Sequence, residues 1–241
     1  MINKNILKYN FMSKRKKLII AFLALIVLAG AGFYFYTKSQ PEPEPVEVNW
    51  HKFLTLDIKS QNLGEEAIKL YQEKFAVLKD RLEKDPKVYR DWISLGILKK
   101  GVGDFEGGRD IWLYAKNLDP ANSLAWGNLG DLYANFLNEP EKAIECFKHA
   151  IELDPLDINY RLGLAEVYRW RLAGKEYLYE QTILEALSAI PNEPNLTLAL
   201  AAYYKEMGQI DKAIAYYEKV LKLVPDSQEV KQELEELKKN R

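Results

Sequence analysis

Residues 126–155 read WGNLGDLYANFLNEPEKAIECFKHAIELDP, and this stretch determines the fold class. Its first half holds a tryptophan, a leucine-glycine pair and a tyrosine at the spacing W-x2-L-G-x2-Y, namely Trp126, Leu129, Gly130 and Tyr133. Small side chains, as at Gly130 and Ala143, let two helix backbones approach at a crossing, and large rings fill the space around it. Pro155 cannot continue a helix and ends the second one. The stretch therefore predicts two antiparallel helices, with Trp126 and Tyr133 as packing residues and not as a ligand pocket.

The same pattern recurs along the chain, in units at residues 89–122, 123–157, 158–193 and 194–227. On these residues the chain resembles the tetratricopeptide-repeat family. Two departures are Lys99, at the usual tyrosine position of its unit, and Thr197, at the usual tryptophan position. The resemblance implies an all-α fold, a right-handed superhelical solenoid of helix-turn-helix repeats, because one unit cannot bury its apolar face alone.

Two further segments flank these units. Residues 47–88 are expected to form a degenerate first repeat or an N-terminal cap, with an apolar stripe from Leu63 to Leu82 and a shorter helix around Trp50 and Phe53. The stripe predicts a second helix roughly two turns longer than standard. Residues 228–241 are predicted to form a C-terminal capping helix, because its apolar residues recur at helical spacing among charges.

The N-terminus carries a separate signal. Residues 18–36 are an uncharged apolar run that, at about 1.5 Å per residue, would span roughly 30 Å of hydrocarbon, so one transmembrane helix is expected before the solenoid. The aromatic residues at 33–36 favour a retained span over the alternative, a signal peptide cleaved after Ala31. Residues 1–17 are basic and residues 37–46 are a Pro/Glu-rich spacer. The expected localisation is the cytoplasmic membrane, single-pass, with a cytoplasmic N-terminus and an extracytoplasmic repeat domain.

Composition argues against several other classes of protein. The formal net charge of −1 combines a basic N-terminus with an acidic remainder, so nucleic acid is not an expected partner. Cys146 is the only cysteine, and the two histidines, His51 and His149, lie far apart, so no metal site is expected. The glycine-rich stretch 101–108 lacks the strand and the Gly-Lys-Ser/Thr of a phosphate loop. We expect no cofactor and no enzymatic activity.

The resemblance implies a concave face lined mainly by the first helix of each repeat. At the positions that line this face in the family, the present sequence has the candidate partner-binding residues Arg90, Ser94, Lys100, Asn128, Asp131, Asn159, Glu166, Arg169, Trp170, Asn195 and Lys205. Ile97 and Asn135 stand at further groove positions. Trp170 is the best candidate for an exposed aromatic anchor, because Trp and Arg are enriched at binding hot spots. The alternative is that Trp170 packs against the turn of its own repeat. Some relatives grip a C-terminal carboxylate, but only Asn128 matches their set, so such a clamp is rejected.

These expectations combine into one functional hypothesis. The chain is expected to be a membrane-anchored, non-enzymatic scaffold that docks a peptide or subunit of an envelope, secretion or translocation assembly in its groove. One alternative is a structural adaptor of the cell envelope that self-associates into a homo-oligomer. Another is a membrane-anchored receptor with cytosolic repeats. The expected partners are a protein or peptide, and the membrane through residues 18–36.

Overall fold

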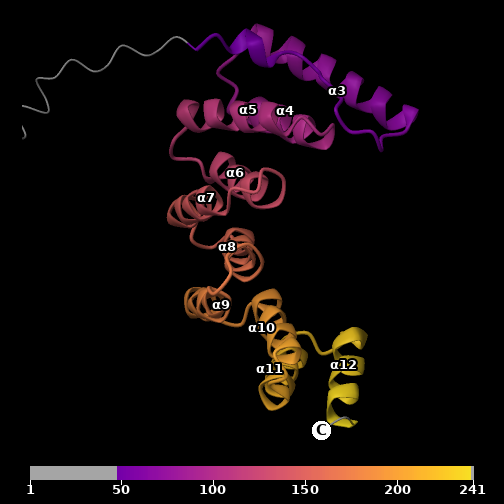
Figure 1. Ribbon diagram of the computed structural model, residues 1–241, viewed down its shortest axis with the longest axis vertical. Helices are drawn as coiled ribbons and strands as arrows, with labels where there is room; N and C mark the ends of the chain where they lie inside the picture. Colours follow the sequence, from indigo (N-terminus) through magenta and orange to yellow (C-terminus); the bar gives the residue numbers. More distant parts are fainter. Residues whose placement is uncertain (1–47, 240–241) are drawn as a thin grey trace, which may run out of the picture. The chain divides into compact units, whose positions relative to one another are not determined.

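The computed structural model describes residues 48–239, and all regular secondary structure in that range is helical, which confirms the prediction of an all-α fold. The helices are shown in Figure 1, and their bounds are η1 Trp50–Phe53, α3 Glu65–Lys84, α4 Tyr89–Gly101, α5 Phe105–Leu118, α6 Ser123–Asn135, α7 Pro140–Leu153, α8 Ile158–Trp170, α9 Tyr177–Ala189, α10 Pro194–Glu206, α11 Ile210–Leu223 and α12 Gln228–Lys239.

Neighbouring helices form pairs that stack in chain order. The closest packing is between α4 and α5, α6 and α7, α8 and α9, and α10 and α11. The second helix of each pair also packs against the first helix of the next, and Figure 1 shows the pairs following one another. First helices of successive pairs meet as well, α4 with α6 and α6 with α8. The predicted solenoid of helix-turn-helix repeats is therefore confirmed.

Glycines set the helix crossings, as the sequence predicts. A Cβ atom added at Gly130 would lie 2.8 Å from Cδ1 of Phe147, and one added at Gly96 would lie 2.5 Å from Cε2 of Trp112. Both distances are too short for a carbon contact, so the rings occupy the space that a side chain would need. Trp112 is fully buried, and its indole N–H donates to the carbonyl of Ile93 at 3.2 Å.

A buried ion pair explains why Lys99 stands where the repeat pattern usually has a tyrosine. Nζ of Lys99 lies 2.7 Å from Oδ2 of Asp104, and only 4% and 6% of the two side chains are exposed. The more exposed Lys59 contacts the other carboxylate oxygen at 2.6 Å, and the N–H of Gly107 donates to the same carboxylate, which caps α5. Burial raises the pKa of Asp104, but hydrogen bonds from Lys59 and Lys99 outweigh it and hold that pKa below its usual value.

The two ends of the stack differ from each other. At the C-terminal end α12 buries Val230, Leu234 and Leu237 and leaves its other face polar, as a capping helix requires. At the N-terminal end α3 has 20 residues against 14 in α5, as expected for a lengthened helix. The helix expected before it is only the four-residue η1. The next residues, Leu54 to Gly64, form no helix, and buried Phe53 packs 6.1 Å from Trp92, ring centroid to ring centroid.

The predicted membrane localisation needs correction. No helix within residues 48–239 is both long enough and apolar enough to cross a bilayer. The longest, α3, is amphipathic and carries charged residues from Glu65 to Lys84. Residues 1–17, 18–36 and 37–46, on which the prediction rests, lie outside the described residues. The single-pass localisation therefore has no support in the structure.

Candidate functional site

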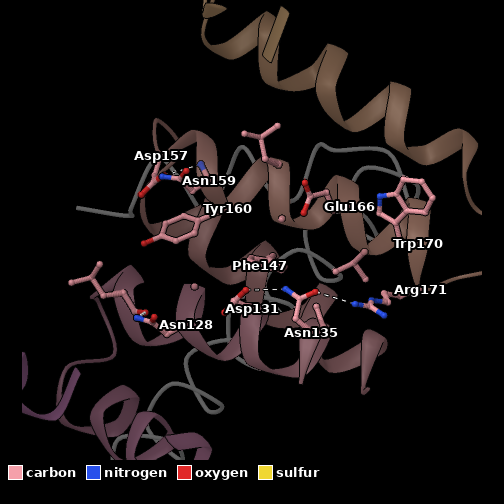
Figure 2. Close-up of a pocket in the computed structure, with 16 residues that line it drawn as sticks. Asn128, Asp131, Asn135, Phe147, Asp157, Asn159, Tyr160, Glu166, Trp170 and Arg171 are labelled. Carbon is pink, nitrogen blue, oxygen red and sulfur yellow. Dashed lines mark hydrogen bonds between the residues drawn. The ribbon is translucent and has the colours of Figure 1, made fainter. Parts of the chain in front are cut away.

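An open groove of about 830 Å³ lies between α6 and α8, the first helices of two successive pairs. Figure 2 shows the side chains that line it. One wall comes from α6 and the other from α8, whereas Phe147 of α7 lies between them. Six of the predicted groove residues line this one space, namely Asn128, Asp131, Asn135, Asn159, Glu166 and Trp170.

Two glycines give the groove an aromatic floor. A Cβ atom at Gly163 would lie 2.6 Å from Cζ of Phe147, and one at Gly127 would overlap the ring of Tyr160. Both rings are buried except for their groove edge, and the Tyr160 hydroxyl donates to Oγ of Ser123 at 3.2 Å. Sequence reasoning did not single out Gly127 or Tyr160 as groove residues. A signal was available for Gly127, since it occupies a helix interior, where glycine is unfavourable without a packing reason.

A polar chain crosses the N-terminal wall of the groove. Lys100 of α4 lies 2.8 Å from Oδ2 of Asp131, whose other oxygen accepts from Nδ2 of Asn135 at 2.9 Å. Arg171 in turn donates to Oδ1 of Asn135 at 3.2 Å, and this last contact joins the two walls (Figure 2). Asp131 is therefore already neutralised, and Asn135 is held in one orientation. These groups shape the wall and leave little free charge to offer a partner.

Other polar residues that line the groove form hydrogen bonds with residues close to them in the sequence. Asn128 donates from Nδ2 to the carbonyl of Leu124 at 2.8 Å, and Asn159 donates to Asp157 at 2.8 Å. Asp157 also accepts from the backbone N–H of Asn159 and caps α8. Among the residues that the structure describes, none donates to the side-chain carbonyl oxygens of Asn128 and Asn159, so both can accept a hydrogen bond from a partner.

Glu166 and Trp170 stand apart from this network. They lie one turn apart on α8, and both line the groove (Figure 2). Within residues 48–239 the Glu166 carboxylate makes no hydrogen bond or ion pair. Trp170 is 64% exposed, which is high for a tryptophan, so it does not pack into the turn of its own repeat. The pair offers an available anion and an available aromatic surface.

Arg169 lies in an aromatic cluster and not on the groove wall. Its guanidinium forms an ion pair with Glu206 of α10, and its side chain is only 8% exposed. The guanidinium carbon lies 4.4 Å from the ring centroid of Trp170, 5.0 Å from that of Tyr179 and 5.1 Å from that of Tyr203. Such cation–π contacts are favourable when desolvated. Arg169 thus packs against the ring of Trp170 and connects α8 to α9 and α10.

The remaining predicted residues lie elsewhere on the first helices. Ser94 and Lys100 line a second groove beside α3, and Arg90 is exposed at the start of α4. Asn195 is exposed at the start of α10, and its backbone N–H donates to Glu193. Lys205 forms an ion pair with Glu233 of α12. The structure therefore does not bring these five residues into the groove between α6 and α8.

Other reactive groups have structural roles. Cys146 is buried, and burial raises the pKa of its thiol to about 12, which removes the thiolate that reactivity requires. The ring of His149 packs 4.5 Å from that of Trp126. In the described range no three His, Cys, Asp or Glu side chains are grouped so that they could hold a metal ion. In the glycine-rich stretch, Gly103 adopts a left-handed conformation with φ of 81° before α5.

Comparisons with known proteins agree with this architecture. Family models described as tetratricopeptide repeat match residues 124–155 and 194–237. Protein FlbA of Caulobacter vibrioides is 29% identical over 145 residues, which cover 60% of this chain and 24% of FlbA, so the chain spans about a quarter of that relative's length.

Two solved structures are similar at the level of the fold. PilW, described as a widely conserved type IV pilus biogenesis factor, has a TM-score of 0.54 and 22% identity, covering 66% of this chain and 72% of PilW. MamA has a TM-score of 0.53 and 19% identity, covering 69% of this chain and 98% of MamA. At these identities the likeness concerns the fold alone. Residues 124–155 and 194–237 are therefore tetratricopeptide repeats within an all-α repeat solenoid.

Proposed function

We propose that this protein is a non-enzymatic scaffold that binds a segment of a partner protein in the groove between α6 and α8. The observation that carries the proposal is the pairing of Glu166 and Trp170 on one wall of an open groove with an aromatic floor. An exposed tryptophan that a buried cation holds in place is a preorganised anchor, and preorganisation lowers the entropy cost of binding. Tryptophan is also among the residues most enriched at binding hot spots.

The chemistry of the groove favours a basic side chain in the partner. The Glu166 carboxylate is available for a salt bridge, and Trp170 offers ring surface for a cation–π contact. A lysine or arginine could contact both groups while its apolar stem lies along the groove floor near Phe147. We therefore propose a partner segment with a lysine or arginine next to an apolar residue.

We propose that the partner is a subunit of an envelope, secretion or translocation assembly. The description of PilW as a type IV pilus biogenesis factor supports this choice, although PilW resembles the present chain only in fold.

Affinity purification with the full chain as bait tests the proposal. Trp170→Ala and Glu166→Gln should each reduce recovery of the same partners, and Trp170→Ala should lower their affinity by about tenfold or more, as for a hot-spot residue. The matched control is Tyr177→Ala, because Tyr177 is equally exposed at 65% and does not line the groove. If both groove variants recover the same partners as the wild type and the control, the groove is not the binding site.

A further inference from the structure

Within residues 48–239, α3 resembles the second helix of a repeat whose first helix is not found there. In each of the four complete pairs, the second helix packs most closely on the first helix of its own pair. α3 packs on α4 as a second helix packs on the first helix of the next pair. Arg81 lies 2.8 Å from Asp91, and Tyr71 lies against Gly101, so α3 runs antiparallel to α4. No helix that could pair with α3 precedes it within the described residues, where only η1 is found.

A groove takes the place of that first helix. It has a volume of about 750 Å³ and lies along α3 and α4, with Phe136 at its end. Most of its side chains are apolar, and four of them are unusually exposed: Leu70 at 50%, Val77 at 58%, Ile97 at 49% and Phe136 at 44%. Exposed apolar side chains that line one concave surface indicate a surface that another element covers.

The repeat itself shows which kind of element fits. Within the repeat, Ile97, Leu98 and Gly101 of α4 occupy the positions of Glu166, Val167 and Trp170 of α8. In α8 these positions face α6, the first helix of the preceding pair. In α4 they face the groove beside α3. A helix in that groove would therefore contact α3 as α6 contacts α7. It would contact α4 as α6 contacts α8.

We propose that this groove binds an amphipathic α-helix of a partner protein, which completes the first repeat by packing against α3 and α4. The first helices α4, α6, α8 and α10 each have 13 residues, so the partner helix should contribute about as many. The partner helix should carry apolar residues at i, i+3, i+4 and i+7, which would pack against Leu70, Val77 and Ile97. It should carry polar residues where it meets Glu73 and Lys74. The proposal does not depend on the groove between α6 and α8.

A second copy of the chain is a poorer occupant of this groove. Among the described residues, α12 is the terminal helix that a second copy could donate, and its apolar residues are already buried against α11. Its outward face carries Gln228, Glu229, Gln232, Glu235 and Glu236, all exposed. Placing these side chains against Leu70, Val77 and Ile97 would desolvate charges without a partner. The chemistry of the groove thus favours a helix from another protein.

Fluorescence anisotropy with a synthetic peptide tests the proposal. The probe is a labelled 13-residue peptide with leucines at i, i+3, i+4 and i+7 and Lys or Glu elsewhere, and the control peptide has the same composition with the leucines scattered. The full chain should bind the probe at least about tenfold more tightly than the control peptide. Ile97→Asp should weaken binding by about tenfold or more, because it places a carboxylate on the apolar surface.

A matched variant and a second measurement complete the test. Leu156→Asp places the same charge on a side chain that is 68% exposed and lies outside the groove, so it should bind the probe as the wild type does. Three results would overturn the proposal: equal affinity for the two peptides, no binding of either, or an Ile97→Asp variant that binds as well as the wild type. A full chain that is dimeric by light scattering and becomes monomeric with Ile97→Asp would also overturn it, since the occupant would be a second copy.

Discussion

Replacing Asp104 with alanine should destabilise the fold far more than removing an exposed charge. The change leaves the ammonium of Lys99 in a site where that side chain is 4% exposed, and it removes the cap of α5. Breaking a buried ion pair by removing one partner costs about 3–5 kcal/mol, and losing a helix cap adds about 1 kcal/mol. We therefore expect a loss of about 4–6 kcal/mol in the free energy of unfolding. This is a large part of the about 5–15 kcal/mol by which a domain is stable.

Urea denaturation of the full chain, followed by circular dichroism, measures this loss. The matched control is Lys59→Ala, which removes the other cation bound to Asp104. Because Lys59 is 49% exposed and solvent screens its charge, this change should cost only a small fraction of the loss caused by Asp104→Ala. A double variant, Lys99→Met with Asp104→Ser, removes both charges and keeps a capping side chain, so it should recover most of the loss. Equal costs for Asp104→Ala and Lys59→Ala, or a double variant as unstable as Asp104→Ala, would refute the reasoning.

Three further predictions concern packing, pH and reactivity. Gly96→Ala should lower the free energy of unfolding by about 1–3 kcal/mol, measured by the same denaturation, because its Cβ would overlap the buried ring of Trp112. The pKa of Asp104 is lower in the folded than in the unfolded state, so its stabilising effect is complete above the unfolded pKa of about 4 and is lost as the pH falls through the folded pKa. Acid titration should therefore destabilise the wild type more than Asp104→Ala below about pH 4. Cys146 should react with iodoacetamide at about pH 8 only after unfolding, because burial raises its pKa to about 12; rapid alkylation of the native chain would contradict this.

The helices and their crossings were predictable because local spacing encodes them. Gly130 beside Phe147 and the proline after α7 act within one repeat, so the sequence pattern contains the whole contact. The groove was predictable only in part. Asn128, Asp131 and Glu166 line it because their positions on a first helix fix the direction of short side chains. Arg169 has a longer side chain, and its partner Glu206 comes from another repeat, which spacing alone does not reveal.

The N-terminal end was less predictable for a different physical reason. Trp50 and Phe53 suggest a helix by spacing, yet only the four-residue η1 forms. Buried Phe53 packs against Trp92 and Tyr114 of the first complete pair, with ring centroids 6.1 and 5.7 Å away. Tertiary packing therefore determines this segment, and the helix position beside α3 stays without an occupant among the residues described.

The contact between Arg169 and Glu206 limits how this solenoid can change in evolution. Repeat proteins generally gain and lose whole units, because each unit contacts only its neighbours. Here a unit inserted between α9 and α10 would separate the Arg169 guanidinium from the Glu206 carboxylate, and loss of the pair α10 and α11 would remove that carboxylate. Either change would leave a desolvated cation beside Trp170. The repeat formed by α10 and α11 therefore cannot be replaced by a repeat that lacks a carboxylate at the position of Glu206. A change in the number of repeats on that side would also alter the surface around Trp170 that a partner contacts.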